Sequence, residues 1–228
     1  MVLEERLIEL RKTLIEFAAL VEHMIESSIN GLVTRNKELL DSVAQTGEPK
    51  ANVLDIKLDE LCATLIAQYQ PMAKDLRIIL MIFKMNEVLE RMADHAVNIS
   101  ESGLYLLETP LVKPLIDIPE MAAVAVKMLQ DSISAFINED ADLAKTVCAR
   151  DSIIDNLRDK TFKELIEVMS ADSSIIKRCL QLMRISRNLE RIADLCTNMC
   201  EDVIFIVEGK IIKHHNIDGQ DGIKQEES

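Results

Sequence analysis

The chain has 228 residues, of which 48% are hydrophobic and 29% charged, so it is long enough to bury a sizeable core. Its 26 basic and 39 acidic residues give a formal net charge of −13, which repels nucleic-acid phosphates and anionic lipid surfaces. Aromatic residues make up only 3% of the chain, so the stacking platforms that bind single-stranded nucleic acid are missing too. We therefore expect no nucleic-acid partner.

Hydrophobic periodicity predicts an all-α protein, because apolar residues recur at spacings of three and four and never alternate with polar ones as in half-buried strands. Asn30-Gly31 suggests the end of the first helix or a kink in it. Pro49 is expected to break or kink the second, because proline lacks an N–H and its ring clashes with the preceding turn. Gln70-Pro71 ends that helix. In chain order, the helices expected in the first half span residues 3–29, 36–70 and 72–107.

A stretch with three prolines, from Pro110 to Pro119, separates this half from a second set of helices. Pro119 suits the first turn of a helix, and the helices expected in the second half span residues 119–137, 141–169 and 174–210. Because both halves consist of three helices, the sequence predicts two pseudo-symmetric antiparallel three-helix bundles. The predicted division is residues 1–109 for the first bundle, 110–118 for the linker, 119–213 for the second bundle and 214–228 for a flexible tail.

An acidic helical segment occurs twice, 100 residues apart, as Leu89-Glu90-Arg91-Met92-Ala93-Asp94 and Leu189-Glu190-Arg191-Ile192-Ala193-Asp194. Side chains three or four residues apart share one helix face. Each segment therefore belongs to an acidic stripe, formed by Glu90, Asp94, Asn98 and Glu101 in the first half and by Glu190, Asp194, Asn198 and Glu201 in the second. Like charges at this spacing cost roughly 0.2 to 0.5 kcal/mol each. A stripe that carries this penalty in both halves is either solvated or neutralised by cations.

The second helices repeat as well, since Asp55 and Asp59 lie 100 residues before Asp155 and Asp159. Neighbouring helices with short connections run antiparallel, so each half is expected to place these carboxylates opposite those of its third helix. Carboxylate and carboxamide oxygens without a repeated His or Cys suit Mg, Mn, Ca or Fe. An oxygen-activating di-iron centre is not expected, because alanine stands where such helices carry a His. A solvated acidic face is the alternative interpretation.

Charged residues beside the stripes distinguish the two halves. Glu87 stands where the second repeat has Arg187, so the first stripe is the more acidic and its metal occupancy can differ from that of the second. Arg91 and Arg191 suit a salt bridge to a stripe carboxylate or a bidentate contact with phosphate.

Cysteine usage and hydropathy point to the cytoplasm. The five cysteines lie in apolar helical patterns without a CxxC pair, which predicts buried, reduced thiols. Cys196 and Cys200 lack the second thiol pair or nearby His of a tetrahedral soft-metal site. No stretch reaches the roughly 18 apolar residues of a membrane span, and the first residues are charged where a signal peptide would be apolar. We therefore expect a cytoplasmic protein.

These motifs together resemble the PhoU family of regulators of phosphate transport and the phosphate regulon. The resemblance rests on Leu-Glu-Arg-(Met/Ile)-Ala-Asp-x-x-x-Asn in both halves and on Gln70-Pro71-x-Ala73-x-Asp75-Leu76-Arg77 between them, and it covers residues 3–213. It implies two three-helix bundles, each with a multinuclear metal site. The implied ligands are Asp55, Asp59, Glu90, Asp94 and Asn98 in the first half and Asp155, Asp159, Glu190, Asp194 and Asn198 in the second.

The resemblance implies a negative regulator of phosphate uptake and phosphate-regulon signalling. Such a protein is a metal-binding adaptor between the ATPase subunit of a phosphate ABC transporter and a phosphate-sensing histidine kinase. It is expected to be a homodimer that reaches the membrane only through its partners and binds Fe, Mn, Zn or Mg. The residues do not support catalysis, because no Ser or Cys is spaced with a His as a nucleophile and no glycine-rich phosphate loop is present. The alternatives are a carboxylate-bridged, metal-dependent phosphohydrolase and a metal-free helical adaptor.

Overall fold

A computed structural model of the chain describes residues 2–208, and within this range the regular elements are helices. They include a π-helical turn, Val43–Gly47, and a short 3-10 turn, Ser173–Ile175. The prediction of an all-α protein is confirmed. The helices are α1 (Val2–Thr34), α2 (Lys37–Ser42), α3 (Glu48–Tyr69), α4 (Ala73–Leu107), α5 (Asp117–Asn138), α6 (Ala141–Ala171) and α7 (Ile176–Glu208).

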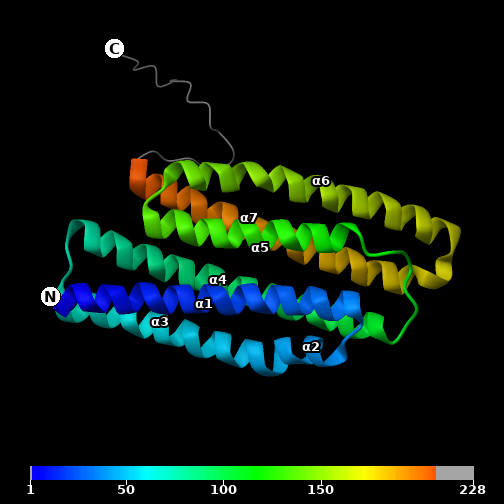
Figure 1. The fold of residues 1–228 in the computed structure, drawn as a ribbon, viewed down its shortest axis with the longest axis horizontal. Coiled ribbons are helices and arrows are strands. Elements are labelled where there is room, and N and C mark those ends of the chain that lie inside the picture. The colour runs from blue at the N-terminus through cyan, green and yellow to red at the C-terminus, as the bar shows by residue number, and fades with distance from the viewer. Residues whose placement is uncertain (1, 209–228) are drawn as a thin grey trace, which may run out of the picture.

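The helices lie along the long axis of the molecule in two groups (Figure 1). In the first half, α1 packs against α3 and α4, and in the second half α5, α6 and α7 pack against one another. The groups meet where α4 packs on α7 and α1 packs on α5. The predicted domain boundary at 109 falls between α4 and α5, and the one at 119 lies in the first turn of α5. The predicted division stays a prediction, and the predicted tail, 214–228, lies outside the described residues.

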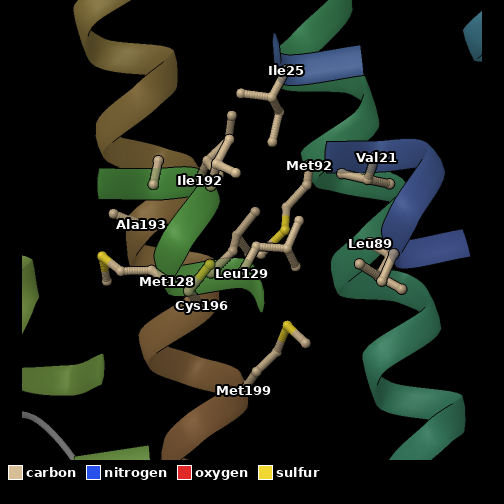
Figure 2. Packing of buried hydrophobic residues seen from close by; sticks show 14 of the residues in the cluster. Val21, Ile25, Leu89, Met92, Met128, Leu129, Ile192, Ala193, Cys196 and Met199 are labelled. Atoms are coloured by element: carbon tan, nitrogen blue, oxygen red, sulfur yellow. The ribbon is translucent and has the colours of Figure 1, made fainter. Parts of the chain in front are cut away.

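One continuous hydrophobic core joins the two groups. The repeated segments contribute to it from both sides: Leu89 and Met92 on α4 and Ile192 and Ala193 on α7 are buried, and Met92 and Ile192 extend into the space between the two helices (Figure 2). Because these apolar side chains occupy the inner faces of α4 and α7, the acidic residues of the same segments are displaced around each helix, away from the core.

Gly31 does not end or kink the first helix as the sequence suggested, since α1 continues to Thr34. The helix ends instead at Arg35, which has a φ of 54° in the left-handed region. A Cβ atom on Gly31 would lie 2.7 Å from Cγ of Leu40. The glycine therefore lets α2 approach α1 closely and is not a helix stop.

The expected interruption near Pro49 is present, but it takes the form of a π-helical turn and does not break the helix. The turn Val43–Gly47 directly precedes α3, and Pro49 lies in the first turn of α3. At that position the missing proline N–H removes no hydrogen bond that the helix needs. The predicted helix end at Gln70-Pro71 is confirmed, because α3 stops at Tyr69 and Gln70 has a φ of 45°.

Of the helices between residues 2 and 208, none combines the length and apolar character that a membrane span requires.

Replacing Phe17 on α1 by Ala tests the shared core. The Phe17 side chain has no exposed surface, and we expect its loss to lower the free energy of unfolding by about 3 to 5 kcal/mol. Phe83→Ala is the matched control, because Phe83 is 48% exposed and should cost only about 0.5 kcal/mol. Urea titration followed by circular dichroism measures both. Two separate transitions, only one of which moves in Phe17→Ala, would contradict a core shared by both halves.

Candidate metal centre

In the first half, α3 and α4 bring two aspartates against an asparagine that the sequence analysis did not select. The Asn86 Nδ2 amide on α4 donates to Asp55 Oδ1 at 2.7 Å, to the Asp55 carbonyl oxygen at 2.9 Å and to Asp59 Oδ1 at 2.9 Å. Asn86 is only 1% exposed. It lies four residues before Glu90 and eight before Asp94, on the same face of α4. We call Asp55, Asp59, Glu90 and Asp94 the first carboxylate group.

The Oδ1 atom of Asn86 is buried and accepts no hydrogen bond within residues 2–208. A buried acceptor without a partner costs about 1 to 3 kcal/mol. Such an atom next to several carboxylates is a suitable partner for a cation or for water bound to one.

The electrostatics of the first carboxylate group are unfavourable without a cation. Burial, followed by the charge of Asp59, raises the pKa of Asp55 although the Asn86 hydrogen bond opposes the rise. Burial also raises the pKa of Glu90, with further contributions from Asp94 and Asp55. No Lys, Arg or His of the described chain forms an ion pair with a member of this group. Negative charges thus gather without an ion-pair partner, and only the more distant charge of Arg91 opposes the rise in the pKa of Glu90.

The equivalent residues in the second half, Asp155, Asp159, Glu190 and Asp194, form the second carboxylate group, and each of them has an ion pair. Arg158 Nη1 lies 2.9 Å from Asp155 Oδ1 and 2.7 Å from Glu190 Oε1, and Nη2 lies 2.8 Å from Asp159 Oδ1. Arg191 Nη1 lies 2.9 Å from Asp194 Oδ2, so the salt bridge suggested for Arg191 is confirmed.

The pKa of Arg158 shows how strongly these carboxylates hold it. Burial would lower that pKa, but the hydrogen bond to Asp159 and the charges of Glu190 and Asp155 raise it overall. The guanidinium is therefore a permanent positive charge inside the second carboxylate group.

The two predicted asparagine ligands lie in different surroundings. Asn98 Nδ2 donates to the Asp94 carbonyl oxygen at 3.0 Å, and Asn98 Oδ1 accepts from Arg184 Nη2 of α7 at 2.6 Å. Arg184 also pairs with Glu101 at 3.2 Å, so Asn98 takes part in a contact between the two halves. Asn198 is exposed. The roles predicted for both asparagines stay predictions.

Across residues 2–208, no three His, Cys, Asp or Glu side chains converge as the ligands of a metal ion do. The donor chemistry of the halves nevertheless differs. The first carboxylate group, with the unpartnered Asn86 oxygen beside it, fits a hard cation that prefers oxygen ligands. The second carboxylate group does not fit one as it stands, because a guanidinium lies among its oxygens. The predicted ligand sets stay predictions.

Sequence reasoning missed Asn86 and Arg158, although each carried a signal. Asn86 extends the acidic stripe of α4 by one turn toward the N-terminus, and Arg158 lies between Asp155 and Asp159 on the matching stretch of α6. The prediction that the five cysteines are buried is confirmed, and that they are reduced stays a prediction. Burial, for example, raises the pKa of the Cys62 thiol to about 12.

Residues 14–103 and 118–203 match the family model described as the PhoU domain. The chain is 37% identical over 217 residues to the phosphate-specific transport system accessory protein PhoU homolog of Aquifex aeolicus, covering 95% of this chain and 98% of that protein. The crystal structure of PhoU from Pseudomonas aeruginosa matches with a TM-score of 0.86 at 30% identity, over 91% of this chain and 99% of that one. The phosphate transport system regulatory protein PhoU from Streptococcus pneumoniae matches with a TM-score of 0.85 at 27% identity, over 93% and 100%.

Equivalent substitutions in the two halves should change stability in opposite directions. In chelator at neutral pH, Glu90→Gln removes one charge from the uncompensated first carboxylate group, and we expect the free energy of unfolding to rise by about 0.5 kcal/mol. Glu190→Gln breaks the ion pair with Arg158 and should lower it by about 1 to 3 kcal/mol. Urea titrations of the two variants and the wild type measure the difference.

The pH dependence gives this prediction a second readout. Because the pKa of Glu90 is raised in the folded protein, the folded state keeps that proton to a higher pH than the unfolded chain. The stability this contributes is lost as the pH rises through the folded pKa. The increase in the free energy of unfolding caused by Glu90→Gln should therefore be complete at neutral pH and should shrink as the pH falls toward about 4. A gain that does not depend on pH, or stabilisation by both substitutions, would contradict the assignment.

Proposed function

Because the chain belongs to the PhoU family, we propose that it acts as an accessory protein that regulates phosphate transport. The family match extends over both halves, and the relatives that align over nearly the whole chain carry the names of phosphate-transport accessory or regulatory proteins. Those names describe regulators and not enzymes, so the proposal is a regulatory role without catalysis.

In its finer form, the proposal is a negative regulator that connects the ATPase subunit of a phosphate ABC transporter with a phosphate-sensing histidine kinase. It works in the cytoplasm as a homodimer and reaches the membrane through these partners. Long helices support such a role because they offer extended faces for docking. Large apolar side chains such as Leu80 and Phe83 on α4 and Phe205 on α7 are 47% to 48% exposed, and surface apolar residues of this size are available for protein contacts.

We further propose that the first carboxylate group binds a divalent or trivalent cation, with Fe, Mn, Zn and Mg as the candidates. The observation that carries this step is the absence, within residues 2–208, of any ion pair to these four carboxylates, while the Asn86 amide draws two of them together. Asp55 and Asp59 from α3 and Glu90 and Asp94 from α4 would hold the cation. A bound cation would supply the missing positive charge and fix α3 against α4.

Loss of the chain from its host should raise phosphate uptake and the expression of a phosphate-starvation reporter, and the wild-type gene should restore both. Asp55→Asn with Glu90→Gln should restore them poorly, because two ligands of the proposed cation lose their charge. Elemental analysis of the purified variant, prepared without chelator, should show less metal than the wild type.

The matched control is Glu5→Gln with Glu16→Gln, which makes the same change of charge at two exposed positions of α1. This control should keep both the metal content and the regulation of the wild type. Equal metal content in the wild type, the ligand variant and the control would contradict the proposed cation site. Unchanged phosphate uptake in the deletion strain would contradict the regulatory role.

A further inference from the structure

Besides Glu87 and Arg187, the two halves differ at Asn86, which is matched by Ser186, and at a position between the paired aspartates of the second helices. With the repeats aligned 100 residues apart, Arg158 takes the place of Leu58. Leu58 on α3 is fully buried in the core. The side chain of Arg158 on α6 is 24% exposed and reaches Glu190 on α7.

The guanidinium of Arg158 makes the contacts that a bridging cation would make. It binds Asp155 and Asp159 on its own helix and Glu190 on the neighbouring helix, at 2.7 to 2.9 Å. It therefore cross-links α6 to α7 through carboxylate oxygens. A guanidinium stays charged at every physiological pH and offers its N–H donors in a fixed plane that suits carboxylates.

We propose that Arg158 is a built-in replacement for a metal ion in the second half, so that cation binding is confined to the first carboxylate group. This inference rests on the metal-binding part of the proposed function and departs from the expectation that both halves bind metal. A cation that enters the second carboxylate group must displace the guanidinium of Arg158 from its carboxylates. The guanidinium would then be a partly buried positive charge beside the positive charge of the cation, which is unfavourable. The first carboxylate group has no such competitor within the described chain.

The charged residues beside the two carboxylate groups support the same inference. Arg191 pairs with Asp194 at 2.9 Å, so two arginines offset half of the negative charge of the four carboxylates in the second group. In the first group, Arg91 forms no ion pair with the four carboxylates in the described residues, and its charge, which lowers the pKa of Glu90, is opposed by that of the nearby Glu87. The electrostatic attraction for a cation is therefore much stronger between α3 and α4 than between α6 and α7.

The decisive variant is Arg158→Leu, which gives the second half the residue that the first half carries at Leu58. The purified full-length chain is dialysed against Mn²⁺ and its bound manganese is measured by elemental analysis. Amide hydrogen exchange with and without Mn²⁺ then locates the binding, with α3 and α4 read separately from α6 and α7.

We expect Mn²⁺ to slow amide exchange in α3 and α4 of the wild type and to leave α6 and α7 unchanged. In Arg158→Leu the bound manganese should increase and α6 and α7 should also be protected. The affinity of the second half for Mn²⁺ should rise on the order of 10- to 100-fold, the size of effect expected when a residue supporting a metal site is changed.

Two controls separate the guanidinium of Arg158 from a general change of charge. Arg191→Leu also removes an arginine from the second carboxylate group but leaves Arg158 in place, and it should not create Mn²⁺ binding between α6 and α7. Arg158→Lys keeps the positive charge and should also bind no Mn²⁺ there. If Arg158→Leu does not fold, Arg158→Gln, which keeps a hydrogen-bonding side chain without the charge, takes its place.

Protection of α6 and α7 by Mn²⁺ in the wild type would overturn the inference, and so would the lack of such protection in a folded Arg158→Leu or Arg158→Gln protein. The proposed function is judged on a different measurement. If Mn²⁺ has no effect on α3 and α4 of the wild type, the proposed cation in the first half fails, whereas Arg158 is still judged on α6 and α7 of its variants.

Discussion

The burial of apolar side chains between α4 and α7 is the constraint on which the rest of the structure depends. Leu89 and Met92 on α4 and Ile192 on α7 fill a core common to both halves, and this fixes the rotation of each helix about its own axis. Glu90, one residue after Leu89, then has only one direction available, away from the core and toward α3. The acidic sites are therefore consequences of how the core is packed.

Once the carboxylates are placed, their mutual repulsion has to be relieved, and the chain relieves it differently in its two halves. In the second half the chain itself supplies the positive charge that reduces this repulsion, as the side chain of Arg158. In the first half Asn86 contributes hydrogen bonds but no charge, so two aspartates are held together while their repulsion persists. One repeated backbone thus supports one site whose charge is partly neutralised by its own arginines and another that attracts cations.

Periodicity and proline positions predicted the helices well, because both act through local sterics and burial, as at Gln70-Pro71. The role of Gly31 was not predictable from its neighbours, since it depends on the approach of Leu40 from another helix. The acidic stripes were predictable from spacing alone. Which side chains contact these carboxylates was not predictable, because Arg158 and Asn86 reach across pairs of helices, and a linear pattern does not show how far a side chain reaches.

The π-helical turn Val43–Gly47 bears on which changes of length this family member can tolerate. A π turn accommodates one residue more than an α-helical turn of the same kind, and one residue corresponds to about 100° of rotation around a helix. Deleting a single residue there would change the rotation of α3 relative to α2 by about that angle. It would also rotate Asp55 and Asp59 out of phase with the part of the helix held against α1. The length of this turn thus sets the angular position of the α3 carboxylates, and an indel at residues 43–47 would have the effect of mutating them.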